Sequence, residues 1–318
     1  MTLEALVAEL RASRGFAHKR DIEGALTQLA PAFAAGIAVG DDCAAIPDGQ
    51  GGHLLFAIEG FVEDFVRAMP WFAGWCGVMV NLSDIAAMGG RATAVVDAQW
   101  APDATSAAPV LAGLAAACQA YGVPLVGGHS NHRAAQANLA VAVLGRAQKL
   151  LTSFDARPGD VLVMAVDLRG AFEEPYPFWN ATRNAPPARL RGDLALLPGL
   201  AEDGLADAAK DISMAGTLGS TLMLLEGSRV GAVVDLATLP APPGVPRSRW
   251  LQAFPSFGFV LSVRPQHLAD VLARFHGRDI AAAAIGTVTA EPQFWLRDGA
   301  ERVLLWDVAA EPFIAPLA

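Results

Sequence analysis

Apolar residues fill most of the stretch 70–88, where two strongly polar side chains, Asn81 and Asp84, interrupt the pattern. These two residues are three positions apart, so a helix would place both of them on one face. Pro70 stands where a helix begins and Gly89-Gly90 where one ends, as the preferences at helix boundaries require. We therefore predict a buried helix that carries a carboxylate, and burial of a carboxylate requires compensation, for example by a metal ion.

The rest of the chain alternates between short apolar runs and amphipathic stretches, which predicts a mixture of strands and helices. A turn-rich segment at 155–160, followed by a new apolar strand, places a domain boundary near residue 150. We expect an α/β (α+β) protein with domains 1–150 and 151–318. The expected helices are 3–10, 21–29, 106–121, 213–226 and 266–276, and the expected strands are 37–46, 53–59, 92–99, 124–126, 138–146, 161–166, 230–236, 257–263 and 280–288.

Composition narrows the class of protein. The chain has 318 residues, of which 53% are hydrophobic and 17% charged, as expected for a packed globular enzyme. Its formal net charge of −9 and its scattered basic residues argue against a nucleic-acid partner. The charged N-terminal stretch does not resemble a signal peptide, no apolar run has membrane-spanning length, and the three cysteines are widely spaced. We therefore expect a cytoplasmic protein with reduced thiols and no membrane partner.

Two further acidic motifs are candidate metal ligands. Asp41 and Asp42 follow Gly40 within a predicted strand, where adjacent carboxylates are unfavourable, and the alternative is a strand end with solvated acids. Asp211 precedes Ser213, a good helix N-cap, so the segment is either a simple cap or a place where a metal ion and a phosphate approach a helix start. Mg²⁺ is commonly held by one or two carboxylates together with substrate phosphates.

A glycine pair, Gly127-Gly128, follows the short strand at 124–126 and precedes His129. Glycines without side chains let a backbone approach a ligand closely, whereas the plainer interpretation is an ordinary turn at the end of a strand. His129 and His132 lack the matching acids or cysteines of a zinc site.

Taken together and in this order, the motifs Gly40-Asp41-Asp42, Asn81-Leu82-Ser83-Asp84, Gly127-Gly128 and Asp211-Ile212-Ser213 resemble those of the aminoimidazole ribonucleotide (AIR) synthetase-like superfamily. Its members include thiamine-monophosphate kinase and selenophosphate synthetase. The resemblance implies a two-domain fold in which the N-terminal domains of a homodimer pair into a β-barrel. It also implies binding of ATP and Mg²⁺. The implied metal ligands are Asp41, Asp42, Glu59, Asp84 and Asp211, and the implied nucleotide-binding residues are Asn81, Gly127, Gly128, His129, Ser213 and Lys19.

The chain departs from thiamine-monophosphate kinases at three positions. Glu59 stands where those enzymes have aspartate, and His129 and Met214 stand where they have acids. The chain also has no cysteine before Cys43, so the reactive cysteine of selenophosphate synthetases is missing. Lys19 and its neighbour Arg20 can reach a phosphate or form a solvated surface pair.

We therefore expect an ATP- and Mg²⁺-dependent enzyme that transfers a phosphoryl group to a small molecule or activates it. The alternatives are a nucleotide-binding partner protein without turnover, a purely structural homodimer and a divergent thiamine-monophosphate kinase. The acceptor is not identified by the sequence. Segment 170–187 is either a lid over the substrate or a plain surface loop.

Overall fold

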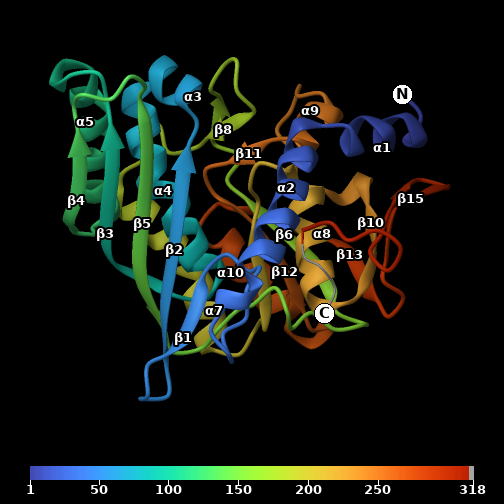
Figure 1. Cartoon of the computed structure of the whole chain (residues 1–318). Coiled ribbons are helices and arrows are strands. Elements are labelled where there is room, and N and C mark those ends of the chain that lie inside the picture. Colours follow the sequence, from blue (N-terminus) through green and yellow to red (C-terminus); the bar gives the residue numbers. More distant parts are fainter. Residues whose placement is uncertain (315–318) are drawn as a thin grey trace. The chain divides into compact units, whose positions relative to one another are not determined.

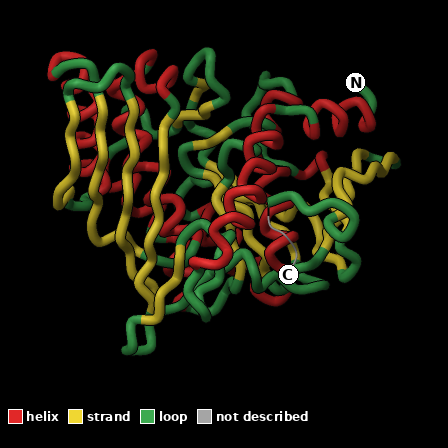
Figure 2. The backbone as a smooth tube through the Cα atoms, viewed as in Figure 1, coloured by secondary structure: helices red, strands yellow, loops and turns green. Residues whose placement is uncertain are grey.

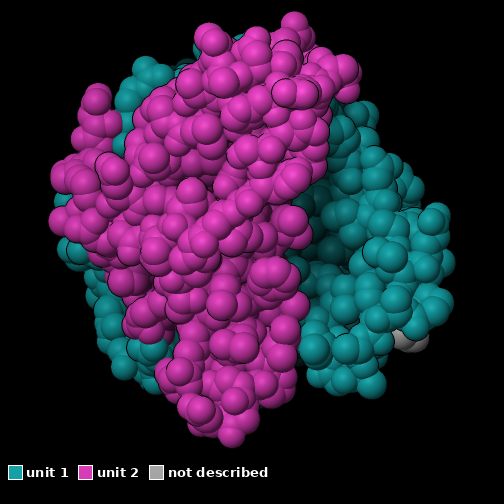
Figure 3. All heavy atoms as spheres, turned by 60° about the vertical axis from the view of Figure 1, so that its left-hand side comes forward, with its two compact units in different colours: residues 1–41, 151–183, 200–318 teal, residues 42–150, 184–199 magenta. Residues whose placement is uncertain are grey.

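The computed structural model describes residues 1–314, and these residues divide into two compact units (Figure 3). Unit 1 contains residues 1–41, 151–183 and 200–318, and unit 2 contains residues 42–150 and 184–199. Neither unit is a continuous stretch of chain. The expected domains, 1–150 and 151–318, therefore differ from these units at residues 1–41 and 184–199.

Unit 2 is built on a five-stranded sheet with the order β1-β2-β5-β3-β4 (Figure 1). The pair β3–β4 is parallel, and the other neighbouring strands are antiparallel. The strands of this sheet are β1 (Ala44–Pro47), β2 (His53–Phe61), β3 (Arg91–Trp100), β4 (Leu125–Asn131) and β5 (Asn138–Ala147). The sheet is open, with β1 and β4 at its edges.

Helices α4 (Pro70–Ala87) and α5 (Ala104–Tyr121) cover one face of this sheet (Figure 1). Two glycines let the helix backbones pack closely. A Cβ on Gly74 would lie 2.1 Å from the carbonyl oxygen of Val110, and one on Gly113 would lie 1.9 Å from that of Trp71. Nearly every residue of α4 is buried, as the continuous apolar sequence predicts. The unit also contains α3 (Glu63–Ala68) and α6 (Pro187–Leu194).

The opposite face of the same sheet carries exposed apolar side chains. Phe56 and Ile58 of β2 are 51% and 65% exposed, and Val126 of β4 is 63% exposed. Alternate residues of a strand point to opposite faces, so Leu55, which is fully buried, belongs to the helix-covered face. An apolar sheet face of this kind usually marks an interaction surface.

Unit 1 contains a seven-stranded sheet with the order β15-β14-β10-β13-β6-β12-β9, in which β10–β14 is the parallel pair (Figures 1 and 2). Its strands are β6 (Val161–Val166), β9 (Ala208–Asp211), β10 (Gly231–Asp235), β12 (Gly258–Val263), β13 (Ala281–Thr289), β14 (Gln293–Asp298) and β15 (Glu301–Asp307). Its helices are α1 (Leu3–Arg11), α2 (Arg14–Leu29), α8 (Gly216–Ser228), α9 (Arg247–Leu251) and α10 (Leu268–His276), with short 3₁₀ turns at Ala30–Ala32, Leu236–Thr238 and Pro265–His267. Helix α7 (Leu196–Glu202) spans the change from unit 2 to unit 1.

The N-terminal helices belong to the core of unit 1. Phe16 of α2 is 1% exposed, and its ring lies 5.2 Å from that of Phe313 and 6.2 Å from that of Trp306. Burial of a large aromatic side chain contributes about 2–3 kcal/mol of hydrophobic free energy. This aromatic cluster therefore fixes α2 to the C-terminal part of the chain.

Three sequence-based predictions of local structure are wrong. Residues 37–39 are irregular and residues 40–43 form bends in place of the first part of the expected strand, and Gly40 has a φ of 105°, which glycine adopts readily. Gly127-Gly128 lies inside β4 and not in a turn after it. Helix α8 begins at Gly216, not at Ser213, because Gly216 has a φ of 66° and breaks the helical path. In addition, none of the helices described in residues 1–314 has the length and apolarity needed to cross a membrane.

Candidate functional site

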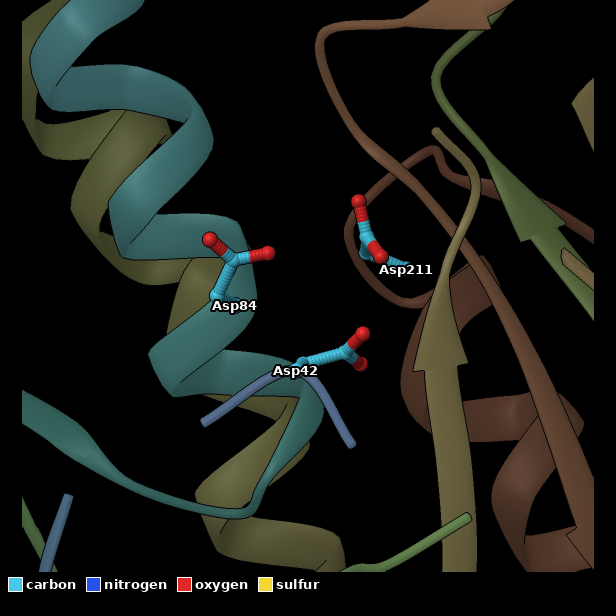
Figure 4. A group of neighbouring side chains, drawn as sticks. All are labelled: Asp42, Asp84 and Asp211. Atoms are coloured by element: carbon cyan, nitrogen blue, oxygen red, sulfur yellow. The ribbon is translucent and has the colours of Figure 1, made fainter. Parts of the chain in front are cut away.

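The metal-ligand candidates of unit 2 are Asp42 and Asp84. Asp84 lies near the C-terminal end of α4 and is 7% exposed, and Asp42 lies just before β1 and is half-buried. Each residue offers a carboxylate oxygen within 4.8 Å of the other, and both carboxylates extend to the same side of α4 (Figure 4). Two ionised carboxylates at this distance repel each other, and a cation held between them relieves the repulsion. Their oxygen donors are those that Mg²⁺ prefers, so the residues present fit this ion.

Asp211, also drawn in Figure 4, belongs to unit 1 and is the last residue of the edge strand β9. It is 5% exposed and lies opposite Phe259 of β12. Lys210, the preceding residue, is 4% exposed, although lysine is almost never fully buried without a compensating partner. This strand end therefore holds two buried charged side chains, of which our sequence interpretation singled out only Asp211.

The other two predicted metal ligands are placed differently. Asp41 accepts hydrogen bonds from the Ser153 amide at 2.8 Å and from the Ser153 hydroxyl at 2.6 Å, both within unit 1. Glu59 lies in β2 opposite Val141. Among the described residues of unit 2, the group of possible metal ligands that contains Asp42 and Asp84 does not include Glu59. Metal binding by Asp41 and Glu59 stays a prediction.

Asn81 is fully buried and connects α4 to the sheet of unit 2. Its side-chain amide donates hydrogen bonds to the carbonyl oxygens of Gly77 at 2.7 Å and of Val141 at 3.0 Å. The first bond lies within α4, and the second reaches β5. This arrangement fixes the position and rotation of the helix that carries Asp84. A direct role of Asn81 in nucleotide binding stays a prediction.

Residues 212–215 connect Asp211, the last residue of β9, to the start of α8. Ser213 donates its amide hydrogen to the hydroxyl of Ser220, and the buried Ser213 hydroxyl has no hydrogen-bond partner within residues 1–314. The N-cap residue of α8 is Ala215, whose side chain cannot accept a hydrogen bond. The amides in the first turn of this helix therefore receive no side-chain cap from the N-cap residue. Such amides favour binding of an anion.

Helix α2 packs directly against this segment. A Cβ on Gly15 would lie 2.2 Å from the carbonyl oxygen of Met214, so only glycine permits the observed approach. Lys19 is four residues further along α2 and therefore shares the helix face of Gly15. It is half-buried, which agrees with a position beside the segment that follows Asp211.

The glycine pair of β4 lies beside an aspartate that sequence reasoning missed. Gly128 pairs with Asp97 of β3, and a Cβ on Gly128 would lie 2.2 Å from the carboxylate oxygen Oδ1 of Asp97. The other oxygen, Oδ2, is buried and has no hydrogen-bond partner within residues 1–314, and burial raises the pKa of this carboxyl group. The sequence signal was a carboxylate in an apolar strand, the same signal that identified Asp84 in its helix.

His129 is the next residue of β4 and is exposed. Its ring lies 6.2 Å from that of Trp100. The structure therefore leaves its imidazole accessible to a ligand, and its predicted role in binding stays untested.

Two domain families match this chain. The N-terminal domain of AIR synthase related protein matches residues 40–147, and the corresponding C-terminal domain matches residues 176–298. The uncharacterized protein sll0787 of Synechocystis sp. is 44% identical over 314 residues, which is 98% of this chain and 97% of that protein. The chain therefore belongs to the AIR synthase related protein family, as the motifs of the sequence indicated.

More distant relatives and solved structures agree with this assignment. Thiamine-monophosphate kinase of Halobacterium salinarum is 29% identical over 265 residues, covering 79% of this chain and 88% of the kinase. Thermotoga maritima PurL complexed with ADP has a TM-score of 0.77 at 19% identity, covering 98% of this chain and 54% of PurL. AaThiL complexed with AMPPCP and TMP has a TM-score of 0.69 at 18% identity, covering 87% and 94% of the two chains. These structural likenesses show the fold.

Proposed function

We propose that the protein is an ATP- and Mg²⁺-dependent enzyme that transfers a phosphoryl group to an oxygen atom of a small molecule. The observation that carries this proposal is the Asp42–Asp84 pair within the segment that matches the family. In such a transfer the bond between the γ-phosphorus and its bridging oxygen breaks, a bond to the acceptor oxygen forms, and ADP leaves. The acceptor loses a proton. The phosphorylated molecule is either the product or an activated intermediate.

The names of similar proteins support this function class. Relatives include thiamine-monophosphate kinases and a selenide, water dikinase of Citrifermentans bemidjiense, which is 30% identical over 196 residues. The chain spans about half of that dikinase, 54% of its length. Structures with the same fold contain ADP, ATP or AMPPCP. We therefore assign ATP as the phosphoryl donor of this protein.

We further propose that Asp42, Asp84 and Asp211 hold Mg²⁺, with Asp41 and Glu59 as additional ligands. When bound, Mg²⁺ neutralises the negative charge of the triphosphate. Asn81 holds the Asp84 helix in place. The nucleotide-binding residues that we propose are Ser213 and Lys19 of unit 1 and Gly127, Gly128 and His129 of unit 2. Each of these residues offers a donor or a close backbone, which suits recognition of an anion.

We also propose that the protein is a cytoplasmic homodimer in which the open sheet faces of two copies of unit 2 pair into a barrel. Phe56, Ile58 and Val126 supply the exposed apolar surface that this pairing would cover. Its three cysteines, Cys43, Cys76 and Cys118, form no disulfide and are buried, which suits a reducing compartment.

Substitution of Asp84 by asparagine tests the proposed metal role. Calorimetric titration with Mg²⁺ and AMPPCP should show at least about ten-fold weaker binding for Asp84→Asn, because one charged ligand is lost. The matched control is Asp64→Asn, which changes a carboxylate that is 83% exposed on α3. Equal melting temperatures of the variants would exclude unfolding as the cause. Unchanged affinity in Asp84→Asn would show that Asp84 is not a metal ligand.

A second candidate function is a nucleotide-binding partner protein that has lost turnover. His129 and Met214 favour it, because neither side chain supplies the oxygen ligands that acids supply. Release of ADP in the presence of an acceptor separates the two candidates, since the partner protein would bind Mg-ATP without consuming it.

A further inference from the structure

Lys19 and Arg20 are adjacent in α2, and the sequence left open whether they reach a phosphate or form a solvated surface pair. The structure separates the two residues. Arg20 forms an ion pair with Glu311 at 2.9 Å, and its guanidinium carbon lies 5.7 Å from the centroid of the Trp306 ring. Lys19 is half-buried, yet it has no hydrogen bond or ion pair within residues 1–314. One cation is therefore engaged, and the other is available to a ligand.

These two cations lie on different faces of α2. Phe16 and Arg20 are four residues apart and share one face, which contacts the C-terminal part of the chain. Gly15 and Lys19 share the next face, about 100° around the helix axis. This second face meets residues 212–215, because Gly15 lies against their backbone. Rotation of α2 away from the first set of contacts would therefore also turn Lys19 away from residues 212–215.

The contacts of the first face come from three residues that we call the C-terminal clamp, namely Trp306, Glu311 and Phe313. Trp306 is 1% exposed and donates its indole hydrogen to the carbonyl oxygen of Glu311 at 2.7 Å. The two carboxylate oxygens of Glu311 each bind one arginine, Oε2 that of Arg11 at 2.8 Å and Oε1 that of Arg20. Arg11 also lies 4.2 Å over the Trp306 ring. Helices α1 and α2, both labelled in Figure 1, thus converge on the clamp.

The clamp is itself held by α8. Glu226 in the last turn of α8 is 3% exposed, and its carboxylate accepts hydrogen bonds from the amides of Phe313 at 2.6 Å and Ile314 at 2.9 Å. A carboxylate at this end of a helix is unfavourable, because the helix dipole is negative there, and hydrogen bonds from amides offset that cost. The other end of α8 follows residues 212–215, which contact Gly15. Both ends of α8 are therefore connected to α2.

The outer part of the clamp contributes more to orientation than to stability. The side chains of Glu311 and Arg20 are 36% and 52% exposed, and ion pairs with this exposure stabilise a fold only slightly. The buried ring of Phe16 holds α2 in the core. A change at Glu311 should therefore alter the orientation of α2 without unfolding unit 1.

We propose that the C-terminal clamp and Arg20 are positioning elements, which fix the rotation of α2 and so present Lys19 to a phosphate group. Arg20 itself does not contact the phosphate. A half-buried ammonium group without a partner loses hydration, and a phosphate returns the lost interactions. The hold of the clamp on α2 is independent of any ligand, whereas the phosphate contact of Lys19 rests on the proposed function. All of these residues belong to unit 1.

Glu311→Gln tests the proposal, because position and charge predict opposite results. Loss of a carboxylate makes the surroundings of Lys19 more positive, so charge alone would strengthen binding of Mg²⁺ and AMPPCP. If Glu311 positions α2, binding should instead weaken about five-fold, as part of one charged hydrogen bond is lost. Calorimetric titration measures the affinity. Unchanged or tighter binding in Glu311→Gln would overturn the proposal.

The matched control is Asp298→Asn. Asp298 is 38% exposed and is paired with Arg247 in the same unit, so this variant also breaks one exposed ion pair. It should leave the affinity for Mg²⁺ and AMPPCP unchanged. Equal weakening by Asp298→Asn and Glu311→Gln would show a general effect of surface charge and contradict the proposal.

A double-mutant cycle shows whether Glu311 acts through Lys19. Lys19→Ala should weaken binding of Mg²⁺ and AMPPCP about ten-fold, and Glu311→Gln should have no further effect in that background. A purely structural role of Glu311 would give additive losses. The same five-fold loss in both backgrounds would therefore overturn the proposal.

Hydrogen exchange of the α2 amides without nucleotide tests the clamp independently of the proposed function. Exchange should be faster in Glu311→Gln than in the wild type and unchanged in Asp298→Asn. Unchanged exchange in Glu311→Gln would show that the clamp does not hold α2, even if the wild type binds nucleotide. Absence of nucleotide binding by the wild type would instead refute the proposed function and the phosphate role of Lys19, whatever the exchange result.

Discussion

Gly15 and Met214 contact each other through their backbones, although 198 residues separate them along the chain. The missing side chain of Gly15 lets the first turn of α2 lie against the segment between Asp211 and α8. Helix α2 therefore lies beside the segment that we propose contacts phosphate. It also brings the helix face that carries Lys19 to this region.

Gly15→Ala should destabilise the protein by about 1–3 kcal/mol, because the new methyl group would overlap the carbonyl oxygen of Met214. Urea denaturation followed by circular dichroism measures this change. Gly24→Ala is the matched control in the same helix, since nothing lies within 4 Å of its Cβ position. The control should be neutral or stabilising by up to about 1 kcal/mol. Equal effects of the two substitutions would contradict the close approach.

Ile58→Asp should convert the proposed homodimer into a monomer. A charge in the centre of the open sheet face would have to be buried without a partner when two faces pair. Analytical ultracentrifugation at micromolar concentration should give about twice the chain mass for the wild type and the chain mass for the variant. Leu29→Asp, which changes a similarly exposed apolar residue of unit 1, should remain dimeric. A monomeric wild-type protein would refute the prediction.

Asp97→Asn should stabilise the protein at pH 7 by up to about 1 kcal/mol, an effect reduced by the partial exposure of the side chain. Burial raises the pKa of Asp97, so the folded state holds its proton more tightly than the unfolded state. Stability therefore falls as pH rises from the ordinary aspartate pKa, about 3.9, through the raised one. Asp97→Asn should lose this dependence of stability on pH, and the variant should be no more stable than the wild type below about pH 4. Thermal unfolding from pH 3 to pH 8 measures it.

The pKa of Asp103, in the same unit, is shifted in the opposite direction to that of Asp97. The backbone N–H of Ser106 donates to the Asp103 carboxylate and lowers its pKa. This stabilisation is present above the ordinary aspartate pKa and is lost as pH falls through the lowered one. Asp103→Asn should therefore be destabilising near neutrality. Identical pH profiles for the Asp97 and Asp103 variants would contradict both assignments.

Thiamine monophosphate should be a poor substrate. His129 and Met214 replace acids of the kinases, so metal ions at these positions would have fewer oxygen ligands. A coupled assay of ADP release, with saturating Mg-ATP and thiamine monophosphate, measures turnover. A rate on the order of 1 per second or faster would identify the protein as a divergent thiamine-monophosphate kinase.

The sequence predicted α4 well because Pro70 and Gly89 mark its ends and continuous apolar residues indicate burial on all sides. Of the strand expected at 37–46, only residues 44–46 lie in a strand, β1; the first part is irregular because its apolar residues do not form a buried face, and Val39 is 43% exposed. Strands β7 (Ala171–Phe172), β8 (Phe178–Asn180) and β11 (Phe254–Pro255) have two or three residues, too few for any periodicity. The hairpin of β14 and β15 was missed although Gly299 marks its turn, because three consecutive apolar residues in β14 hide the alternating burial of this strand.

The candidate site was less predictable than the helix that carries it. Asp84 stands out locally as a carboxylate in an apolar helix, but its approach to Asp42 depends on how the loop before β1 lies beside α4. Only the resemblance to a family connected these residues beforehand. Glu173 and Arg183 were not recognised as a pair, because no periodic pattern connects residues ten positions apart across a hairpin.

Strands β7 (Ala171–Phe172) and β8 (Phe178–Asn180) belong to a short segment of the chain between β6 and α6 that lies outside the seven-stranded sheet. It is held by the pairing of β8 with β11 (Phe254–Pro255) and by the contact of Trp179 with Trp250, whereas nearly every residue of α4 is buried. Evolution or protein engineering can therefore replace this segment without changing the helix that carries Asp84. Closely related chains are then free to differ in this segment and still keep the same buried helix with its carboxylate.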